Sequence, residues 1–311
     1  MMAKVAVIQA GSVLFDTPAT MDKLARLAGE AAEAGAKLAV FPEAFVGGYP
    51  KGMDFGVKVG WRTPEGRDWF ARYFHSAITV PGAETAQMSE IAARYAMQMV
   101  IGVIERDGGT LYCTALIFTA DGLLAGKHRK LMPTAMERII WGQGDGSTLP
   151  VIQTEIGRIG AVICWENYMP LLRTAMYGQG VELYCAPTVD DRDSWANSMR
   201  HIAFEGRCFV LSAVQYFTRD DAPADCPIAA EPGAVLIRGG SSITGPLGED
   251  LAAPVYGREA VLTADIDVDS LARAKFDLDT VGHYARPDVF SLKIDWTAKH
   301  AINPPDEPLS G

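Results

Sequence analysis

The chain has 311 residues with 28 basic and 38 acidic side chains, which gives a formal net charge of −10 at pH 7. A chain of this length buries a large core without a second domain, and its negative charge disfavours contact with nucleic-acid phosphates and anionic membrane surfaces. The five cysteines and five histidines are scattered, and no apolar run reaches the ~20 residues that cross a bilayer. We therefore expect a reduced, cytoplasmic protein that needs no metal or cofactor and has no nucleic-acid or membrane partner.

Apolar strands and amphipathic helices alternate in the first half of the chain. The pattern begins at once with a strand over residues 5–10, with no signal-peptide pattern before it. Residues 47–75 form a long connection rich in aromatic residues and glycine, which we expect to be a pocket wall, a subunit contact or a packed insertion. The other predicted elements are a helix over 21–34, a strand over 38–41, a helix over 84–95, and a hairpin of strands over 99–104 and 112–119.

The second half repeats this alternation. Residues 218–233 are predicted to be a surface loop, and residues 301–311 a flexible C-terminal tail, neither of which should hold chemistry. The predicted elements are strands over 159–163, 182–185 and 209–214, separated by helices over 171–177 and 194–205. Together the two halves predict a layered α/β domain.

Three reactive side chains stand where predicted strands end. Cys164 lies between the strand over residues 159–163 and a helix, at a turn where a thiol can project beyond the sheet. Glu43 follows the strand over 38–41, and Lys130 follows the hairpin. Taken alone, a cysteine is commonly a small buried hydrophobe, and a charged residue after a strand is commonly solvated. Together they supply a nucleophile, a base and a cation at one edge of a sheet, which predicts a reaction centre.

The same segments resemble motifs of a known family. The three runs occur in that family's order and are Phe41-Pro42-Glu43, His128-Arg129-Lys130-Leu131-Met132-Pro133-Thr134 and Cys164-Trp165-Glu166-Asn167. Over nearly its whole length the chain is similar to the nitrilase branch of the carbon-nitrogen hydrolases. Residues 141–146 and 282–288 resemble true nitrilases rather than amidases, and residues 169–177 and 184–188 resemble plant-type and related bacterial enzymes.

The resemblance implies a fold and an assembly as well as an active site. It implies a four-layer α-β-β-α sandwich built by a single domain over residues 1–300. It also implies that Glu137 orients Lys130 and steers protons, with a solvated helix charge as the alternative. Finally, it implies a homo-oligomer, a dimer or a larger helical assembly, in which the segment through residues 282–284 packs at a subunit interface.

The three strand-end residues suit an attack on a nitrile. A nitrile carbon is a weak electrophile, so it needs a thiolate close by and a cation where negative charge develops on nitrogen. We assign these roles to Cys164 and Lys130, and the role of general base to Glu43. Strand alternation places His128 and Lys130 on one face and Arg129 on the other, so Arg129 is expected to be structural.

Six side chains near the motifs are candidates for contact with substrate, although aromatic residues are also common in cores. They are Tyr49, Thr134, Trp141, Trp165, Thr188 and Trp195. The other four cysteines are expected to be inert, because they lie in apolar strands or in a loop without a nearby base. They are Cys113, Cys185, Cys208 and Cys226.

Several functions use the same three catalytic residues. The leading hypothesis is a nitrilase that converts a nitrile and water to a carboxylic acid and ammonia. An amidase, or an enzyme that hydrolyses cyanide or cyanoalanine, is the alternative, although the Trp165-Glu166 pair and residues 282–288 favour a nitrilase. A non-enzymatic scaffold would be expected to lack Glu43, Lys130 or Cys164, and all three are present.

Overall fold

Two β-sheets pack face to face in the computed structural model, which describes residues 2–300. The first sheet has the strand order β15-β1-β2-β5-β6-β7, in which β1, β2 and β5 are parallel and the others antiparallel to their neighbours. These strands are β1 (Met2–Gln9), β2 (Leu38–Val40), β5 (Gln98–Asp107), β6 (Thr110–Phe118), β7 (Leu124–Arg129) and β15 (Ala260–Asp267).

The second sheet has the order β12-β13-β11-β10-β9-β8, with β14 paired to β13. Its parallel centre is formed by β9, β10 and β11. The strands are β8 (Val151–Thr154), β9 (Gly157–Ala161), β10 (Leu183–Thr188), β11 (Phe209–Val214), β12 (Tyr216–Thr218), β13 (Val235–Thr244) and β14 (Asp250–Tyr256). The sheets meet where β1 contacts β11 and β13.

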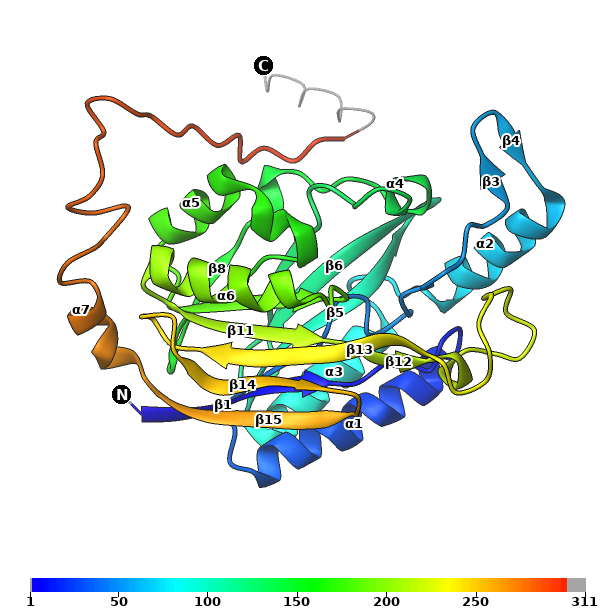
Figure 1. Cartoon of the computed structure of the whole chain (residues 1–311), viewed down its shortest axis with the longest axis horizontal. Coiled ribbons are helices and arrows are strands. Elements are labelled where there is room, and N and C mark those ends of the chain that lie inside the picture. Colours follow the sequence, from blue (N-terminus) through cyan, green and yellow to red (C-terminus); the bar gives the residue numbers. More distant parts are fainter. Residues whose placement is uncertain (1, 301–311) are drawn as a thin grey trace, which may run out of the picture.

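Helices cover the outer face of each sheet (Figure 1). The helices α1 (Thr17–Glu33) and α3 (Ala83–Tyr95) lie on the first sheet, while α5 (Pro170–Gly178) and α6 (Asp193–Gly206) lie on the second. The start of α1 is typical, since the Asp16 side chain accepts a hydrogen bond from the Ala19 N–H and a proline stands in the first turn. The layer order is therefore α-β-β-α, which confirms the predicted sandwich.

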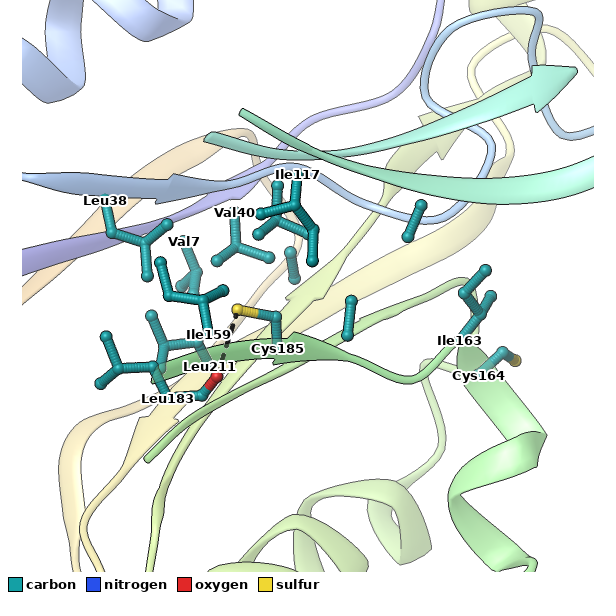
Figure 2. Packing of buried hydrophobic residues seen from close by; sticks show 14 of the residues in the cluster. Val7, Leu38, Val40, Ile117, Ile159, Ile163, Cys164, Leu183, Cys185 and Leu211 are labelled. Carbon is teal, nitrogen blue, oxygen red and sulfur yellow. Dashed lines mark hydrogen bonds between the residues drawn. The ribbon is translucent and has the colours of Figure 1, made fainter. Parts of the chain in front are cut away.

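Strand β1 illustrates why both sheets are buried on both faces. Its alternate residues Val5 and Val7 point to the core between the sheets, whereas Ala6 and Ile8 point to the core beneath the helices. Figure 2 shows the inter-sheet core, where aliphatic side chains of the two sheets interdigitate. Such strands carry near-continuous apolar runs, which is the pattern seen in the sequence.

Shorter elements complete the chain. They are the hairpin β3 (Val57–Lys58) and β4 (Trp61–Arg62), the helices α2 (Pro64–Ser76), α4 (Glu137–Ile140) and α7 (Leu271–Ala274), and the 3-10 helices η1 (Gly146–Thr148), η2 (Cys164–Tyr168), η3 (Arg219–Asp221) and η4 (Val268–Ser270). After α7 the chain runs along the outside of the molecule (Figure 1) and returns to the body where the Lys299 N–H donates to Asp145 Oδ2 at 2.7 Å.

Most predicted elements are present, with boundaries shifted by a few residues. The long connection over residues 47–75 is different, because it contains the hairpin β3–β4 and the 13-residue helix α2. Residues 218–233 are mainly loop, as predicted. Three of them, Ala222, Cys226 and Ile228, are nevertheless buried in the core that the second sheet forms with helices α5 and α6. The predicted tail over residues 301–311 lies outside the described residues.

Candidate active site

The Cys164 turn begins where the second sheet ends. Strand β9 stops at Ala161, and Cys164 opens η2 with a φ of 50°. A left-handed backbone is costly for a residue with a Cβ, so the surroundings must hold it. Asn167 does so, because its Nδ2 donates to the carbonyl oxygens of Val162 at 3.0 Å and Cys164 at 2.8 Å. In Figure 2 the sulfur of Cys164 lies at the margin of the inter-sheet core and points away from it.

Glu43 reaches the same place from the first sheet. It follows β2, and the next residue, Ala44, has a φ of 51°. Gly102 on the neighbouring strand β5 leaves room for this turn because it has no side chain. A Cβ there would come within 2.1 Å of the Pro42 carbonyl oxygen. Gln215 Nε2 donates to the Glu43 carbonyl oxygen at 2.7 Å and fixes the backbone.

Lys130 lies between two carboxylates. Its Nζ donates to Glu43 Oε1 and to Glu137 Oε2, each at 2.7 Å, and the side chain is fully buried. Glu137 is fixed in turn, because Oε2 accepts the Thr134 N–H at 2.7 Å and Oε1 accepts the Tyr49 hydroxyl at 2.8 Å. Lys130 therefore pairs with two buried carboxylates at once. Glu137 accepts hydrogen bonds from Lys130 Nζ, the Thr134 N–H and the Tyr49 hydroxyl.

Burial sets the protonation behaviour of the site. It raises the pKa of Glu43 above 4.5, against the lowering effect of the Lys130 charge. Burial also raises the pKa of the Cys164 thiol, and the charge of Glu43 adds to this effect. Burial lowers the pKa of Lys130, but Glu43, Cys164 and Glu137 outweigh it and hold that pKa well above its usual range. The resting site thus pairs a lysine cation with a protonated thiol that needs a base.

The base and the thiol are close together. The Cys164 thiol lies close enough to the Glu43 carboxyl group to lower its pKa, although by less than burial raises it. Glu43 Oε2 is buried and accepts no hydrogen bond from the described residues. A buried acceptor without a hydrogen-bond donor costs free energy, and a catalytic role is one reason why such an atom is kept. The arrangement can move a proton from sulfur to Glu43 while Lys130 stays charged.

A cavity of about 310 Å³ opens above the sulfur. Its rim includes Asp190, whose carboxylate accepts Trp165 Nε1 at 2.8 Å and Arg192 Nε at 2.8 Å. The guanidinium of Arg192 also stacks on the Trp165 ring, 4.6 Å from the ring centroid. The cavity is lined by Tyr49, Lys51, Thr134, Glu137, Cys164, Trp165, Val189, Asp190, Asp191 and Arg192.

The candidates for substrate contact divide into three groups. Tyr49, Thr134 and Trp165 line the cavity. Thr188 is fully buried close to the Cys164 thiol, whose pKa it lowers by less than burial raises it, and its Oγ1 accepts the Asp190 N–H at 2.9 Å. Trp141 lies behind the lysine, with its ring centroid 5.5 Å from Lys130 Nζ, and lines an adjoining cavity of about 160 Å³.

Two expectations need correction. Trp195 does not line the cavity above Cys164, because it is buried in the core beneath α6 and its Nε1 donates to Ser212 Oγ at 2.8 Å. Cys113 does have a base nearby, because its Sγ lies 3.5 Å from Glu43 Oε1. Burial and the Glu43 charge raise the pKa of Cys113 well above its usual range, so it remains a neutral donor. In the sequence Cys113 is part of an apolar strand, and nothing in that pattern indicates a contact with Glu43.

Some residues of the site were not singled out beforehand. Lys51, Asp190, Asp191 and Arg192 line the cavity, and the last three follow directly after β10. The strand-end rule that found Glu43 would have found them too. Arg129 faces outward, as predicted, and binds Glu105 and Asp107. Within residues 2–300, no group of three or more acidic, histidine or cysteine side chains could hold a metal ion, and no helix is long and apolar enough to cross a membrane.

Comparison with known proteins gives consistent matches. The carbon-nitrogen hydrolase family model matches residues 4–276. An aliphatic nitrilase of Sinorhizobium fredii (strain HH103) is 62% identical over 301 residues, which cover 96% of this chain and 97% of that protein. A bifunctional nitrilase/nitrile hydratase of Lupinus angustifolius is 56% identical over 305 residues, or 96% of this chain and 86% of that protein.

The fold has counterparts among solved structures. A carbon-nitrogen hydrolase from Helicobacter pylori G27 has a TM-score of 0.70 at 22% identity, covering 88% of this chain and 92% of that chain. At this identity the likeness shows the fold alone.

Proposed function

The chain belongs to the carbon-nitrogen hydrolase family, and we propose that it is a nitrilase that hydrolyses an organic nitrile to a carboxylic acid and ammonia. The observation that carries this proposal is the buried arrangement of Cys164, Glu43 and Lys130, in which Cys164 lines a cavity and Lys130 pairs with Glu43 behind it. The relatives at 62% and 56% identity, which are named as nitrilases, support the choice of a nitrile over an amide.

The first step joins the thiol to the nitrile. Glu43 takes the proton of Cys164 through its free oxygen, and the sulfur attacks the nitrile carbon. Negative charge develops on the nitrile nitrogen, where the Lys130 ammonium stabilises it and supplies a proton. The product is a thioimidate, in which the carbon is bonded to sulfur and doubly bonded to NH.

Water completes the reaction in two additions. Glu43 first returns the thiol proton to Lys130, whose Nζ lies 2.7 Å from Glu43 Oε1, so that the carboxylate and the ammonium are restored. The first water, activated by Glu43, then converts the thioimidate to a tetrahedral adduct that carries OH, NH2 and sulfur. Loss of ammonia leaves a thioester, and a second water releases the carboxylic acid and regenerates the thiol. Glu137 holds Lys130 during these steps through the 2.7 Å contact and relays protons toward the leaving nitrogen.

The tetrahedral adduct has a second possible fate. If sulfur leaves before ammonia, the product is an amide instead of an acid. Protonation of the nitrogen favours acid formation, and Lys130, which Glu137 holds in place, supplies that proton in the proposed mechanism. The bifunctional name of the Lupinus angustifolius relative makes the ratio of acid to amide a property worth measuring for this chain.

The substrate lies in the cavity above the sulfur. Tyr49, Thr134 and Trp165 contact it from the walls, Thr188 supports the thiol from below, and Trp141 packs behind the lysine. Tyr49 acts as a neutral donor, because burial raises the pKa of its hydroxyl far above 10.0.

We also propose that the chain works as a homo-oligomer, a dimer or a larger assembly. The segment after α7 supports this, because it exposes large apolar side chains that a partner would cover: Phe276, Tyr284, Val289, Phe290, Leu292 and Trp296. Size-exclusion chromatography with light scattering tests the proposal, and a fully active species of 33.5 kDa would contradict it. The five unpaired cysteines support a reducing, cytoplasmic location.

An ammonia-release screen tests the activity. Aliphatic, aromatic and arylacetonitriles are compared with their matching amides at equal concentrations. We expect release from at least one class of nitrile and little release from the amides. Release from amides alone would make the chain an amidase and contradict the proposed function.

A further inference from the structure

A third buried carboxylate joins the two halves of the site. Glu166 is almost fully buried, and its Oε1 accepts the Leu131 N–H at 2.5 Å. Its Oε2 accepts the Ile163 N–H at 3.0 Å and faces His128 Nε2 at 2.9 Å. Leu131 follows Lys130, and Ile163 precedes Cys164. One side chain therefore ties the residue beside the cation to the residue beside the nucleophile.

The charge of His128 follows from its partners. Its Nδ1 lies 2.6 Å from the Thr148 carbonyl oxygen, which can only accept, so Nδ1 carries a proton. Its Nε2 faces Glu166, whose two oxygens each accept a backbone N–H and are thus suited to the ionised form. With acceptors on both sides, the ring is held as a cation. Burial lowers the pKa of His128, but Glu166 and these hydrogen bonds raise it above 6.5.

The bridge spans the two sheets. His128 lies in β7 of the first sheet and Leu131 follows that strand, whereas Ile163 and Glu166 follow β9 in the second sheet. Lys130 and Cys164 come from these same two segments, and no covalent connection nearby fixes their separation. Reaction rates fall steeply when such a separation changes by even ~1 Å.

We propose that Glu166 and His128 form a positioning ion pair that holds the Cys164 turn against the Lys130 segment in the geometry required for attack. The proposal rests on the function of Cys164 as the nucleophile. Neither residue lines the cavity above the sulfur, so neither touches the substrate. The pair acts through the backbone on both sides of the reacting groups.

Glu166→Gln separates this role from simple space filling. A glutamine has the same shape, but only one of its two terminal atoms accepts hydrogen bonds. Either the Leu131 N–H or the Ile163 N–H then faces an NH2 group, and His128 loses its counterion. His128→Asn is a milder change, which can keep the bond to the Thr148 carbonyl and leaves both bonds from Glu166 to the backbone in place.

Glu182→Gln is the matched control. Glu182 also accepts a backbone N–H, from Arg158 at 2.9 Å, and pairs with a basic side chain, Arg158 Nη2, at 3.0 Å. It precedes β10, at the opposite end of the strands from Cys164. The control therefore removes a similar bridge without touching the site.

Two measurements on the purified full-length variants test the proposal. The first is the rate at which iodoacetamide alkylates Cys164, followed by mass spectrometry of its peptide, which does not depend on nitrile turnover. The second is steady-state kinetics on a nitrile, with the melting temperature measured in parallel. We expect Glu166→Gln to slow alkylation and kcat by roughly 10- to 100-fold with KM changed less than about threefold. His128→Asn should slow both by a smaller factor, and Glu182→Gln should slow neither.

Normal alkylation of Cys164 in a folded Glu166→Gln protein would overturn the proposal, as would equal slowing in Glu182→Gln. If Glu166→Gln does not fold, His128→Asn decides: slower alkylation at an unchanged KM supports the pair, and unchanged alkylation refutes it. Absence of nitrile turnover in the unmodified protein would instead refute the proposed function, while the alkylation rates would still test the pair.

Discussion

The ion pairs of Lys130 and those of Glu105 lie on opposite faces of one strand end and can be compared directly. On the inner face Lys130 is fully buried between Glu43 and Glu137. On the outer face one buried acid, Glu105, binds two partly exposed cations, Lys127 and Arg129, and Arg129 also binds the exposed Asp107. The two clusters contain the same kinds of groups, but the ratio of acids to cations and the access of water differ.

The pKa values of the two acids move in opposite directions. Burial raises the pKa of Glu43 above 4.5, and the charge of Glu137 adds to this effect, whereas the charge of Lys130 opposes it without reversing it. Burial also raises the pKa of Glu105, but hydrogen bonds from Arg129 and Lys127 outweigh it and hold that pKa below 4.5. A carboxylate that binds several cations is held ionised and stabilises the fold. A buried carboxylate with fewer cations beside it can take up and release a proton.

The largest expected effect separates the two clusters by activity. Glu43→Gln removes the base and Lys130→Met removes the cation, so each should lower kcat by at least ~100-fold. Arg129→Gln changes the neighbouring residue on the outer face and should alter kcat by less than about threefold. Steady-state assays on one nitrile compare the three proteins.

The double variant sharpens this test. Because Glu43 and Lys130 act on the same step, Glu43→Gln combined with Lys130→Met should be about as slow as the slower single variant. Full additivity of the two losses would mean that the residues act independently, contrary to the mechanism.

A smaller effect is expected from Cys113, which donates to Glu43 Oε1. Removing a donor from a carboxylate raises its pKa, so Cys113→Ala should move the acidic limb of kcat/KM to higher pH and lower kcat by roughly 2- to 5-fold. Cys185→Ala is the control, because Cys185 is buried in the same inter-sheet core (Figure 2), where its thiol lies 3.9 Å from the Leu183 carbonyl oxygen. Identical pH profiles for the two variants would show that Cys113 only fills space.

The outer cluster should be visible in stability instead of activity. The pKa of Glu105 is lower in the folded protein than its ordinary value of 4.5. Its contribution to stability is therefore fully present above pH 4.5 and is lost as the pH falls through the folded-state pKa. Glu105→Gln should therefore reduce the free energy of unfolding by about 2 kcal/mol at pH 7, and the difference should shrink below pH 4.5. Urea titrations at pH 7 and pH 4 measure it; a difference that grew toward acid would reverse the sign proposed here.

The smallest expected effect is that of a chelator. The proposed reaction is carried by Cys164, Lys130 and Glu43, so dialysis against EDTA should leave activity unchanged within error. Loss of activity that a divalent metal restores would show that the mechanism lacks a component.

Much of the fold followed from apolar periodicity, because β1, β2 and β5 are buried on both faces and read as unbroken apolar runs. Helix α2 was missed, since its aromatic residues and neighbouring glycines suggested an irregular connection. A start signal was present there, because Thr63 caps the helix through the Gly66 N–H and Pro64 follows it. The pair Thr63-Pro64 would therefore have predicted the start of this helix, although the composition of the segment suggested a loop.

The site was predictable where it depends on strand ends and motifs, and unpredictable where it depends on how the sheets pack. Glu43, Lys130, Glu137 and Cys164 meet because the carboxyl ends of β2, β7 and β9 lie at one edge. No pattern along the chain could place Cys113 beside Glu43, or bury Trp195 away from the cavity, because these contacts join segments that are distant in sequence.

The identity of the nucleophile is the central claim, and trapping the covalent intermediate tests it most directly. Protein quenched with acid during turnover of a nitrile is digested, and each cysteine-containing peptide is weighed by mass spectrometry. The account predicts an added thioimidate or acyl mass on the peptide that contains Cys164, and no such mass in Cys164→Ala, which should fold but not turn over. An adduct on Cys113, Cys185, Cys208 or Cys226 instead, or turnover by Cys164→Ala, would contradict it.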